Sequence, residues 1–396
     1  MKKFSQTVIL LSFVSLFADI ASELLYPVLP LYLKSIGMGA IYIGMLEGVA
    51  DFTAGISKTY FGKWSDRLGR RMPFVWAGYM LSSFSKAFIG VFVSPVWVLF
   101  TRSLDRLGKG IRTSSRDAIL SNESTEENKG AVFGFHRAMD TTGAFIGPIL
   151  ALIYLHFFPG EYRKLFILSL LPAVAVAFLL LKVKEVKSVG KKEAKSIFFS
   201  SLSYWKEASS QYKKVVIIIL VFTLVNSSDM FLLLKVKEVT GSDLSVIKFY
   251  IFYNFVYASL SYTLGSLSDR HGRMKIYALG LIFFAMAYLL IGTASAEWIL
   301  YLAFFFYGLF AAGTEGISKA WISSLCKKED LGVALGLQNT TQSICAMFAS
   351  FIAGFVWMKF GSMFVFLMSG VITLLIVIIL FWLKKYKYLQ EVSVHH

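Results

Sequence analysis

The sequence predicts an all-α polytopic membrane protein with about twelve transmembrane helices, arranged as two pseudo-symmetric six-helix bundles. Hydrophobic residues make up 56% of the 396-residue chain and charged residues only 16%. Apolar runs long enough to span about 30 Å of hydrocarbon recur along almost the whole length. Lysine and arginine concentrate in alternate loops, and one turn motif occurs twice. These observations together favour two related membrane bundles.

The apolar runs give the order of the predicted membrane helices. Each run is expected to be helical, because lipid offers backbone groups no hydrogen-bond partner. The predicted spans of the N-terminal bundle, residues 1–182, are 8–33, 41–62, 73–93, 96–119, 130–155 and 165–182. Those of the C-terminal bundle, residues 215–396, are 215–235, 246–266, 274–293, 297–323, 332–357 and 362–383.

Residues 183–214 are predicted to be a basic cytoplasmic linker between the bundles. The stretch Ile197–Tyr212 mixes aromatic and polar side chains, and lysines surround it. This composition favours an amphipathic helix on the membrane surface. A solvated linker is the alternative.

The formal net charge of +16 has two explanations. Nucleic-acid binding needs a soluble basic face, and the sequence offers none. The positive-inside rule explains the charge better and places both termini in the cytoplasm, as in a multi-pass protein of the cell (inner) membrane. Asp19 and Glu23 interrupt the first apolar run, so it is predicted to be a membrane helix and not a cleaved signal.

A nine-residue turn motif occurs once in each half. Gly62, Asp66, Arg67, Gly69 and Arg70 recur with the same spacing as Gly265, Asp269, Arg270, Gly272 and Arg273. The glycines permit a tight turn, and the arginines are expected to pair with carboxylates at helix ends, such as Asp117. The repeat predicts two related halves.

The fifth predicted span carries small residues at regular spacing. They are Gly134, Gly143, Gly147 and Pro148. The glycines are expected to let two helices pack closely, and the proline removes a backbone donor and permits bending. Small-residue packing without any role in transport is the alternative.

The fourth predicted span carries a charged stripe. Its members recur at steps of three or four residues: Arg102, Asp105, Arg106, Lys109, Arg112 and Arg116. Each ionised residue at membrane depth costs roughly 2.5–3.5 kcal/mol on insertion scales. The stripe is therefore expected to face the protein interior, where it forms a charge network.

The partners of this stripe are expected on other spans of the N-terminal half. The candidates are Asp19, Glu23, Glu47, Asp51, His136, Arg137 and Asp140. An acid that alternates between paired and free states can carry a proton. Asp19, Glu23, Glu47 and Asp51 are the candidate carriers, of which Glu23 and Asp51 lie deepest in the predicted spans. A purely structural ion-pair network is the alternative.

The C-terminal half carries fewer charges, and its polar residues are candidates for a substrate cavity. They are Asn226, Asp229, Asn254, Glu315, Lys319 and Asn339. Glu315 and Lys319 have the i,i+4 spacing of a helical ion pair. Cys326 and Cys345 suggest neither a disulfide framework nor a metal site, and no metal or cofactor is predicted.

At the two turn motifs and from Arg102 to Pro148 the chain resembles the major facilitator superfamily. The resemblance covers essentially the whole chain and implies a secondary transporter that works by alternating access. In that family the turn motif acts as a latch that forms in one access state. The Gly134–Pro148 pattern is similar to one associated with drug–proton antiporters, although its trailing glycine pair is replaced by Ala151 and Leu152. Arg102 occupies the place of an arginine implicated in proton coupling.

The resemblance therefore implies proton-coupled efflux of a small organic molecule. Proton-coupled uptake or exchange of an organic anion is the alternative within transport. A membrane-embedded enzyme or receptor is the alternative outside it, but no nucleotide loop, metal spacing or nucleophile–base pattern favours one. The expected partners are the substrate, protons and the lipid bilayer, and the chain is expected to be a monomer.

Overall fold

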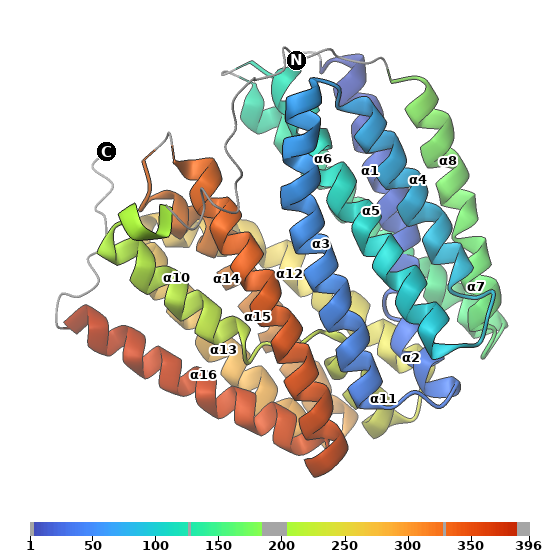
Figure 1. Ribbon diagram of the computed structural model, residues 1–396. Helices are drawn as coiled ribbons and strands as arrows, with labels where there is room; N and C mark the ends of the chain where they lie inside the picture. The colour runs from blue at the N-terminus through green and yellow to red at the C-terminus, as the bar shows by residue number, and fades with distance from the viewer. Residues whose placement is uncertain (1–3, 126–127, 184–203, 328–329, 386–396) are drawn as a thin grey trace. The chain divides into compact units, whose positions relative to one another are not determined.

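The computed structural model describes residues 4–125, 128–183, 204–327 and 330–385, and all regular structure in these ranges is helical (Figure 1). The predicted all-α fold class is therefore confirmed. The chain divides into two compact units, one of residues 1–38 and 49–194 and the other of residues 39–48 and 195–396. Residues 184–203 of the predicted linker, which include the first part of the predicted surface helix Ile197–Tyr212, lie outside the described residues, and residues 204–207 are helical.

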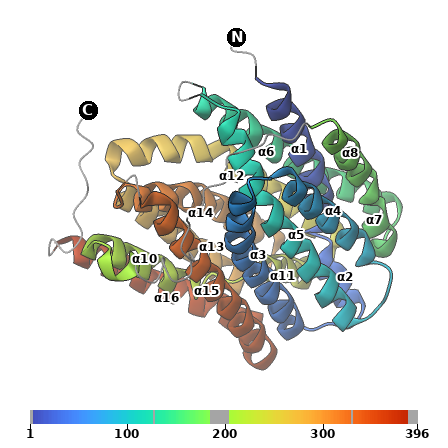
Figure 2. The same ribbon diagram turned by 45° about the horizontal axis from the view of Figure 1, so that its top comes forward.

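The first unit is built from α1 to α8. Their bounds are α1 (Gln6–Leu25), α2 (Leu29–Ser35), α3 (Ala40–Leu68), α4 (Met72–Phe88), α5 (Pro95–Asn122), α6 (Lys129–Phe157), α7 (Tyr162–Leu168) and α8 (Leu170–Leu181). α1 packs against α6 and α8, and α4 packs against α5 (Figure 2). The Ser5 hydroxyl caps α1 by accepting a hydrogen bond from the Val8 amide at 3.2 Å. The first residues of α3, up to Gly48, group with the second unit.

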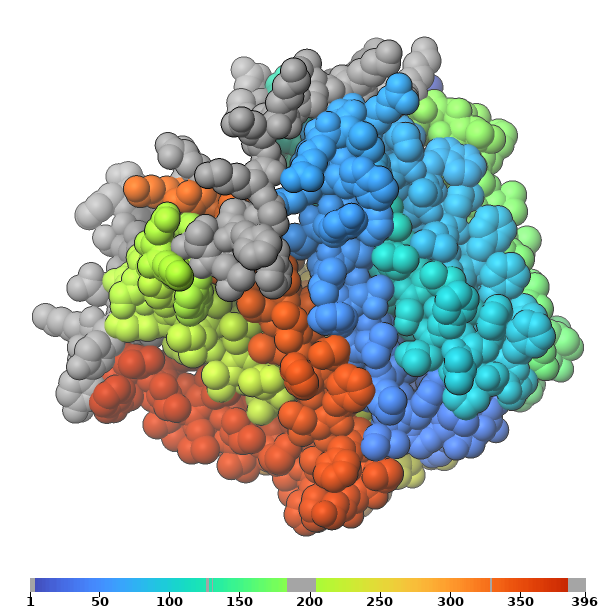
Figure 3. All heavy atoms as spheres, in the orientation of Figure 1, coloured from blue at the N-terminus to red at the C-terminus, as the bar shows by residue number. Residues whose placement is uncertain are grey.

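The second unit is built from seven further described helices. They are α10 (Ser210–Thr223), α11 (Met230–Thr240), α12 (Asp243–His271), α13 (Arg273–Thr293), α14 (Glu297–Ser323), α15 (Leu331–Phe360) and α16 (Ser362–Lys385). α13 packs against α14 and α16, and α12 packs against α14. Helices α10, α15 and α16 form the face of this unit that is visible in Figure 3.

Each predicted span falls on one helix or on two consecutive helices. Among the described residues, seven helical segments are long and apolar enough to cross a bilayer by length and composition alone. They are Gln6–Ser35, Ala131–Phe157, Tyr162–Leu181, Arg273–Thr293, Glu297–Ser323, Leu331–Phe360 and Ser362–Leu383. The other predicted spans fall on α3, α4, α5, α12 and the pair α10 and α11. Of these, α4 is only 17 residues long and α5 carries the charged stripe.

Three spans that were predicted to be continuous are interrupted. Pro27 and Pro30 follow the end of α1, and α7 ends at Leu168, four residues before Pro172. A proline ring clashes with the carbonyl group four residues earlier and lacks an N–H group, which explains both interruptions. Between α10 and α11, the polar run from Asn226 to Asp229 replaces helix, because short polar side chains compete for backbone hydrogen bonds.

The two turn motifs form tight turns of the same kind. Gly69 and Gly272 both adopt positive φ, at 63° and 95°, directly after α3 and α12. The Arg273 guanidinium lies 3.7 Å from Asp269 and donates to the Ala320 carbonyl at 3.1 Å. In the first motif these contacts come from Arg71, which lies 3.2 Å from Asp66 and donates to the Ala118 carbonyl at 3.1 Å.

The first motif therefore corrects one assignment made from the sequence. Motif spacing pointed to Arg70, but Arg70 is exposed and its neighbour Arg71 makes the contacts that Arg273 makes in the second unit. Asp117, the carboxylate expected near this turn, lies 2.9 Å from Arg116 on its own helix. The motif thus joins α3 to α5 through a backbone carbonyl.

Glycines allow the close packing of α1 against α6. A Cβ atom on Gly143 would lie 2.5 Å from the Leu16 carbonyl oxygen, and one on Gly147 would lie 2.7 Å from the Leu24 nitrogen. Both distances are too short for a real side chain, so α1 and α6 approach at a separation that only glycine permits. Gly134 belongs to the same sequence pattern but has open space at its Cβ position.

We therefore expect Gly143→Ala to destabilise the protein and Gly134→Ala not to. Gly143→Ala should force α1 away from α6 and cost about 1–3 kcal/mol. Gly134→Ala should be neutral or stabilise α6 by about 0.5–1 kcal/mol through helix propensity. The melting temperatures of the two purified variants measure the difference. Equal changes in melting temperature would contradict the packing described for Gly143.

Candidate functional site

The charged stripe lies on α5, and its residues differ in exposure. Arg102, Asp105 and Arg112 are 6%, 5% and 2% exposed. Arg106 and Arg116 are half-buried, and Lys109 is exposed on the first unit. Three of the six charged side chains are therefore enclosed by neighbouring helices.

Asp105 lies at the centre of a buried cluster that joins α4 to α5. The Lys86 Nζ atom lies 2.8 Å from Oδ1 of Asp105, and Nη1 of Arg102 lies 3.3 Å from Oδ2. The Ser82 hydroxyl donates to Oδ1 at 2.6 Å and accepts from Lys86 at 2.5 Å. Both carboxylate oxygens are thus satisfied, and Asp105 is held in a buried ion pair.

Sequence reasoning did not include Lys86 or Ser82 in this cluster. Lys86 lies in the third predicted span, where it has no charged companion. The sequence did contain a signal, because a single lysine is costly to place in a hydrocarbon segment. Such a lysine is expected to pair with an acid on a neighbouring helix. Close packing brings the two helices together, since a Cβ atom on Gly108 of α5 would lie 2.6 Å from the Gly78 carbonyl oxygen of α4.

A second charged group lies where α1 meets α6. A Cβ atom on Gly143 would lie 3.0 Å from the Cβ atom of Asp19, so Asp19 is in direct contact with this part of α6. Asp140 precedes Gly143 by three residues and lies on the same face of α6. It is an electrostatic neighbour of Asp19, which means that it lies close enough for the two charges to interact. Nε2 of the buried His136 lies 3.7 Å from Oδ1 of Asp140. Two carboxylates and one imidazole are therefore brought together.

Cations of α5 lie beside this carboxylate pair. Lys109 and Arg112 are electrostatic neighbours of Asp19. The Arg112 guanidinium carbon lies 4.1 Å from the centre of the Tyr79 ring, a cation–π distance. Arg116 donates to the Ser15 hydroxyl of α1 at 3.0 Å. The acids at the α1–α6 contact therefore lie within reach of positive charge from α5.

The other predicted members of the network lie at varied depths. Glu23 is half-buried and is an electrostatic neighbour of Asp19. Glu47 and Asp51 lie one turn apart on α3, with Glu47 buried and Asp51 half-buried. Arg137 is exposed on α6.

A cavity of about 370 Å³ opens within the second unit. Five of the six predicted cavity residues line it: Asn226, Asp229, Glu315, Lys319 and Asn339. Aromatic residues form much of the remaining wall: Phe222, Tyr253, Tyr277, Tyr307 and Phe310. Asn254 is absent from the lining, and its side-chain amide donates to the Tyr250 carbonyl of its own helix at 3.0 Å.

The two carboxylates of this cavity accept hydrogen bonds from tyrosines. Tyr307 donates to Oδ1 of Asp229 at 2.5 Å, and Tyr257 donates to Oε2 of Glu315 at 2.8 Å. Glu315 is thus bound to Tyr257 of α12 and not, as its spacing predicted, to Lys319, which is exposed on the same helix. The lining therefore offers two carboxylates, one ammonium group and several amides to a ligand.

Comparison with known families identifies the class of protein. A family model described as Major Facilitator Superfamily matches residues 11–253 and 249–393. The chain belongs to the Major Facilitator Superfamily. It is accordingly a multi-pass membrane protein of a transporter family and not an enzyme.

Individual relatives differ in how much of the chain they cover. An uncharacterized transporter of this superfamily from Methanocaldococcus jannaschii is 32% identical over 380 residues, 94% of each chain. The quinolone resistance protein NorA of Staphylococcus aureus is 25% identical over only 125 residues, 32% of each chain. The crystal structure of the nucleoside transporter NupG matches 96% of this chain and 100% of its own, with a TM-score of 0.80 at 11% identity. This last likeness shows the superfamily fold.

We expect the Asp105 cluster to be a major source of stability for the first unit. Asp105→Asn should leave Lys86 and Arg102 without their buried carboxylate, at a cost of about 3–5 kcal/mol. The matched control is Glu161→Gln, which removes the acid of a surface pair whose atoms lie 3.1 Å apart. It should cost less than about 1 kcal/mol. The measurement is the melting temperature of each purified variant, and equal losses would contradict the expectation.

Proposed function

We propose that the chain is a secondary transporter that exports a small organic molecule in exchange for protons. The observation that carries this proposal is the proximity of Asp19 and Asp140 at the α1–α6 contact. Two carboxylates in one low-dielectric site repel each other when both are ionised, so they tend to hold one proton between them. A site of this kind can load and release a proton when its surroundings change.

The cations of α5 supply such a change. Lys109 and Arg112 stabilise the ionised form of Asp19 while they lie near it. Their withdrawal would favour the protonated form. Alternation between two arrangements of α5 against α1 would therefore couple proton release to a conformational step. Depth in the spans favoured Glu23 and Asp51 as carriers, whereas contact between helices favours Asp19 and Asp140. The Asp105 cluster has both carboxylate oxygens satisfied and serves in this proposal to join α4 to α5.

Two features favour export. The Gly143, Gly147 and Pro148 spacing on α6 is similar to the pattern associated with drug–proton antiporters, and the first two glycines pack against α1 beside Asp19. The partial likeness to a quinolone resistance protein points in the same direction. The first feature concerns the segment that carries the proposed proton site.

The cavity in the second unit is the proposed substrate site. Its lining holds the carboxylates of Asp229 and Glu315 against the single ammonium group of Lys319. The tyrosine hydroxyls that bind the carboxylates are neutral donors, so they leave the negative charge in place. Aromatic walls favour flat apolar bodies and cations. A small organic cation is therefore the favoured substrate.

A second candidate is proton-coupled uptake or exchange of an organic anion. The exposed side chains of Lys319 in the second unit and Lys109 in the first favour it, because either could bind a carboxylate or phosphate. The two candidates require opposite charge on the transported molecule.

Neutralising either member of the carboxylate pair should separate proton coupling from exchange. In inverted vesicles with an imposed proton gradient, Asp19→Asn and Asp140→Asn should each reduce gradient-driven transport at least about tenfold and retain substrate exchange. Retained exchange shows that the variants are folded. The control Glu161→Gln should transport normally. If both asparagine variants still concentrate substrate against its gradient, the proton-site assignment is wrong.

The charge of the preferred ligand can be tested on the purified protein. A panel of small organic cations, anions and neutral molecules is screened for a rise in melting temperature, since a binder stabilises the folded state by mass action. Cations should bind best, and Glu315→Gln should weaken their binding about tenfold, as expected for loss of a charge-assisted contact. Preferential binding of anions, lost in Lys319→Gln, would support the second candidate.

A further inference from the structure

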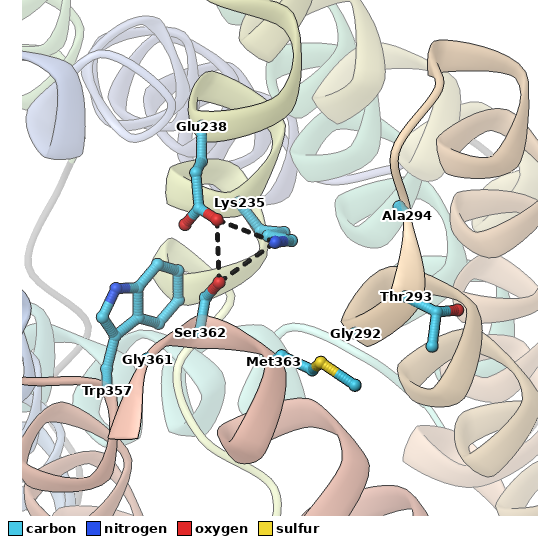
Figure 4. Close-up of a pocket in the computed structure, with 9 residues that line it drawn as sticks. All are labelled: Lys235, Glu238, Gly292, Thr293, Ala294, Trp357, Gly361, Ser362 and Met363. Carbon is cyan, nitrogen blue, oxygen red and sulfur yellow. Dashed lines mark hydrogen bonds and ion pairs between the residues drawn. The ribbon is translucent and has the colours of Figure 1, made fainter. Parts of the chain in front are cut away.

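A second cavity of the second unit, of about 550 Å³, opens where α11, α13 and α16 meet (Figure 4). Its lining residues are Lys235, Glu238, Gly292, Thr293, Ala294, Trp357, Gly361, Ser362 and Met363. α13 runs from the motif turn at Gly272 to this cavity, so the two features lie at opposite ends of α13. The cavity shares no lining residue with the proposed substrate site.

Three polar side chains form a closed triangle in one wall of this cavity. Lys235 Nζ lies 2.8 Å from Oε1 of Glu238 and donates to the Ser362 hydroxyl at 3.0 Å. The Ser362 hydroxyl in turn donates to the same Glu238 oxygen at 2.9 Å. Lys235 is only 6% exposed and Ser362 only 7%, whereas the Glu238 side chain is 45% exposed. A buried ammonium and an accessible carboxylate therefore face the cavity side by side.

The triangle leaves binding capacity on both charges. An ammonium group has three N–H donors, and Lys235 uses two of them on described residues. Among the described residues, Oε2 of Glu238 accepts no hydrogen bond, because Lys235 and Ser362 both contact Oε1 of this carboxylate. One positive and one negative site thus remain available a few ångströms apart.

The helix ends around the cavity have the matching polarity. Ser362 is the first residue of α16, where backbone N–H groups have no partner within the helix. Across the cavity, Gly292, Thr293 and Ala294 lie at the C-terminal end of α13, which is the negative end of the helix dipole (Figure 4). The side with Lys235 therefore favours an anionic group, and the side with the α13 end, together with Glu238, favours a cationic one.

The position of the cavity along the helices indicates a lipid as the occupant. The predicted membrane spans 274–293 and 362–383 end and begin at this level, where phospholipid headgroups lie. Beside the cavity, Phe360, Met363 and Phe364 are 51%, 47% and 58% exposed. These side chains can contact acyl chains, while the polar wall contacts a headgroup.

We propose that this cavity binds the zwitterionic headgroup of a phospholipid that carries a primary ammonium group. The phosphate accepts hydrogen bonds from Lys235 and from the first N–H groups of α16. The ammonium donates to Glu238 and to the last carbonyl groups of α13. A headgroup bound in this way bridges α11, α13 and α16 at the end of the unit that the positive-inside distribution predicts to face outward.

The test uses the full purified chain, stripped of lipid in detergent. Short-chain phosphatidylethanolamine, phosphatidylcholine and phosphatidylglycerol are added at equal concentrations, with soluble phosphoethanolamine as a fourth arm. Phosphatidylethanolamine should raise the melting temperature by roughly 3 °C at saturation, at least about twice the effect of the other lipids. Phosphatidylcholine has no N–H group to donate to Glu238, and phosphatidylglycerol has no cation.

Two matched variants separate headgroup recognition from a purely structural ion pair. Glu238→Gln and Glu161→Gln each remove the acid of an i,i+3 pair with lysine. Glu238→Gln should abolish the preference for phosphatidylethanolamine over phosphatidylglycerol, and Glu161→Gln should leave it unchanged.

Three results would overturn the proposal. The first is an equal effect of all three lipids on the unmodified protein. The second is an unchanged lipid preference in Glu238→Gln. The third is a full effect from soluble phosphoethanolamine, which would assign the cavity to a free zwitterion. The lipid ranking of the unmodified protein decides the question even if a variant fails to fold.

Discussion

The arrangement of the first unit depends on one constraint: hydrocarbon cannot solvate the charges of α5. Ionised side chains at steps of three and four residues form one stripe, so a single orientation of the helix must satisfy them together. On α4, Lys86 and Ser82 contact the Asp105 carboxylate. On α1, the Ser15 hydroxyl accepts a hydrogen bond from Arg116. The close approach of α4 to α5 at Gly78 and Gly108 follows, because short side-chain contacts require short distances between helices.

The two units bind acidic side chains in different ways. In the first unit, Asp105 is neutralised by two cations, which fixes it in place. In the second unit, Asp229 and Glu315 receive neutral tyrosine hydroxyls, which fill hydrogen-bonding capacity without cancelling charge. An acid paired with cations holds helices together, whereas an acid bound by neutral donors in a cavity keeps the negative charge that the proposed cationic substrate requires. In this proposal the same residue type is structural in one unit and takes part in recognition in the other.

Periodicity and hydropathy predicted the spans well, because lipid imposes length and polarity on every helix. They did not predict the break at Asn226–Asp229, because a polar run inside an apolar span fits either a helix with a polar face or a loop. Cavity residues were predicted from polarity alone, and five of six line one cavity. Arg71 was missed because motif spacing does not distinguish it from its neighbour Arg70. Lys86 was missed because its partner Asp105 lies on another helix.

The close packing at Gly143 links the fold to the proposed proton site. Gly143 brings α1 against α6, and the same contact places Asp19 near Asp140. At an effective dielectric constant of about 20, two unit charges repel by about 4 kcal/mol at 4 Å and about 3 kcal/mol at 6 Å. That difference changes proton affinity by a factor of about ten. In the proposed mechanism, a change of about 2 Å in the distance between the two carboxylates would therefore shift their proton affinity by that factor. A residue larger than glycine would remove this sensitivity, because it would hold the carboxylates apart in every state.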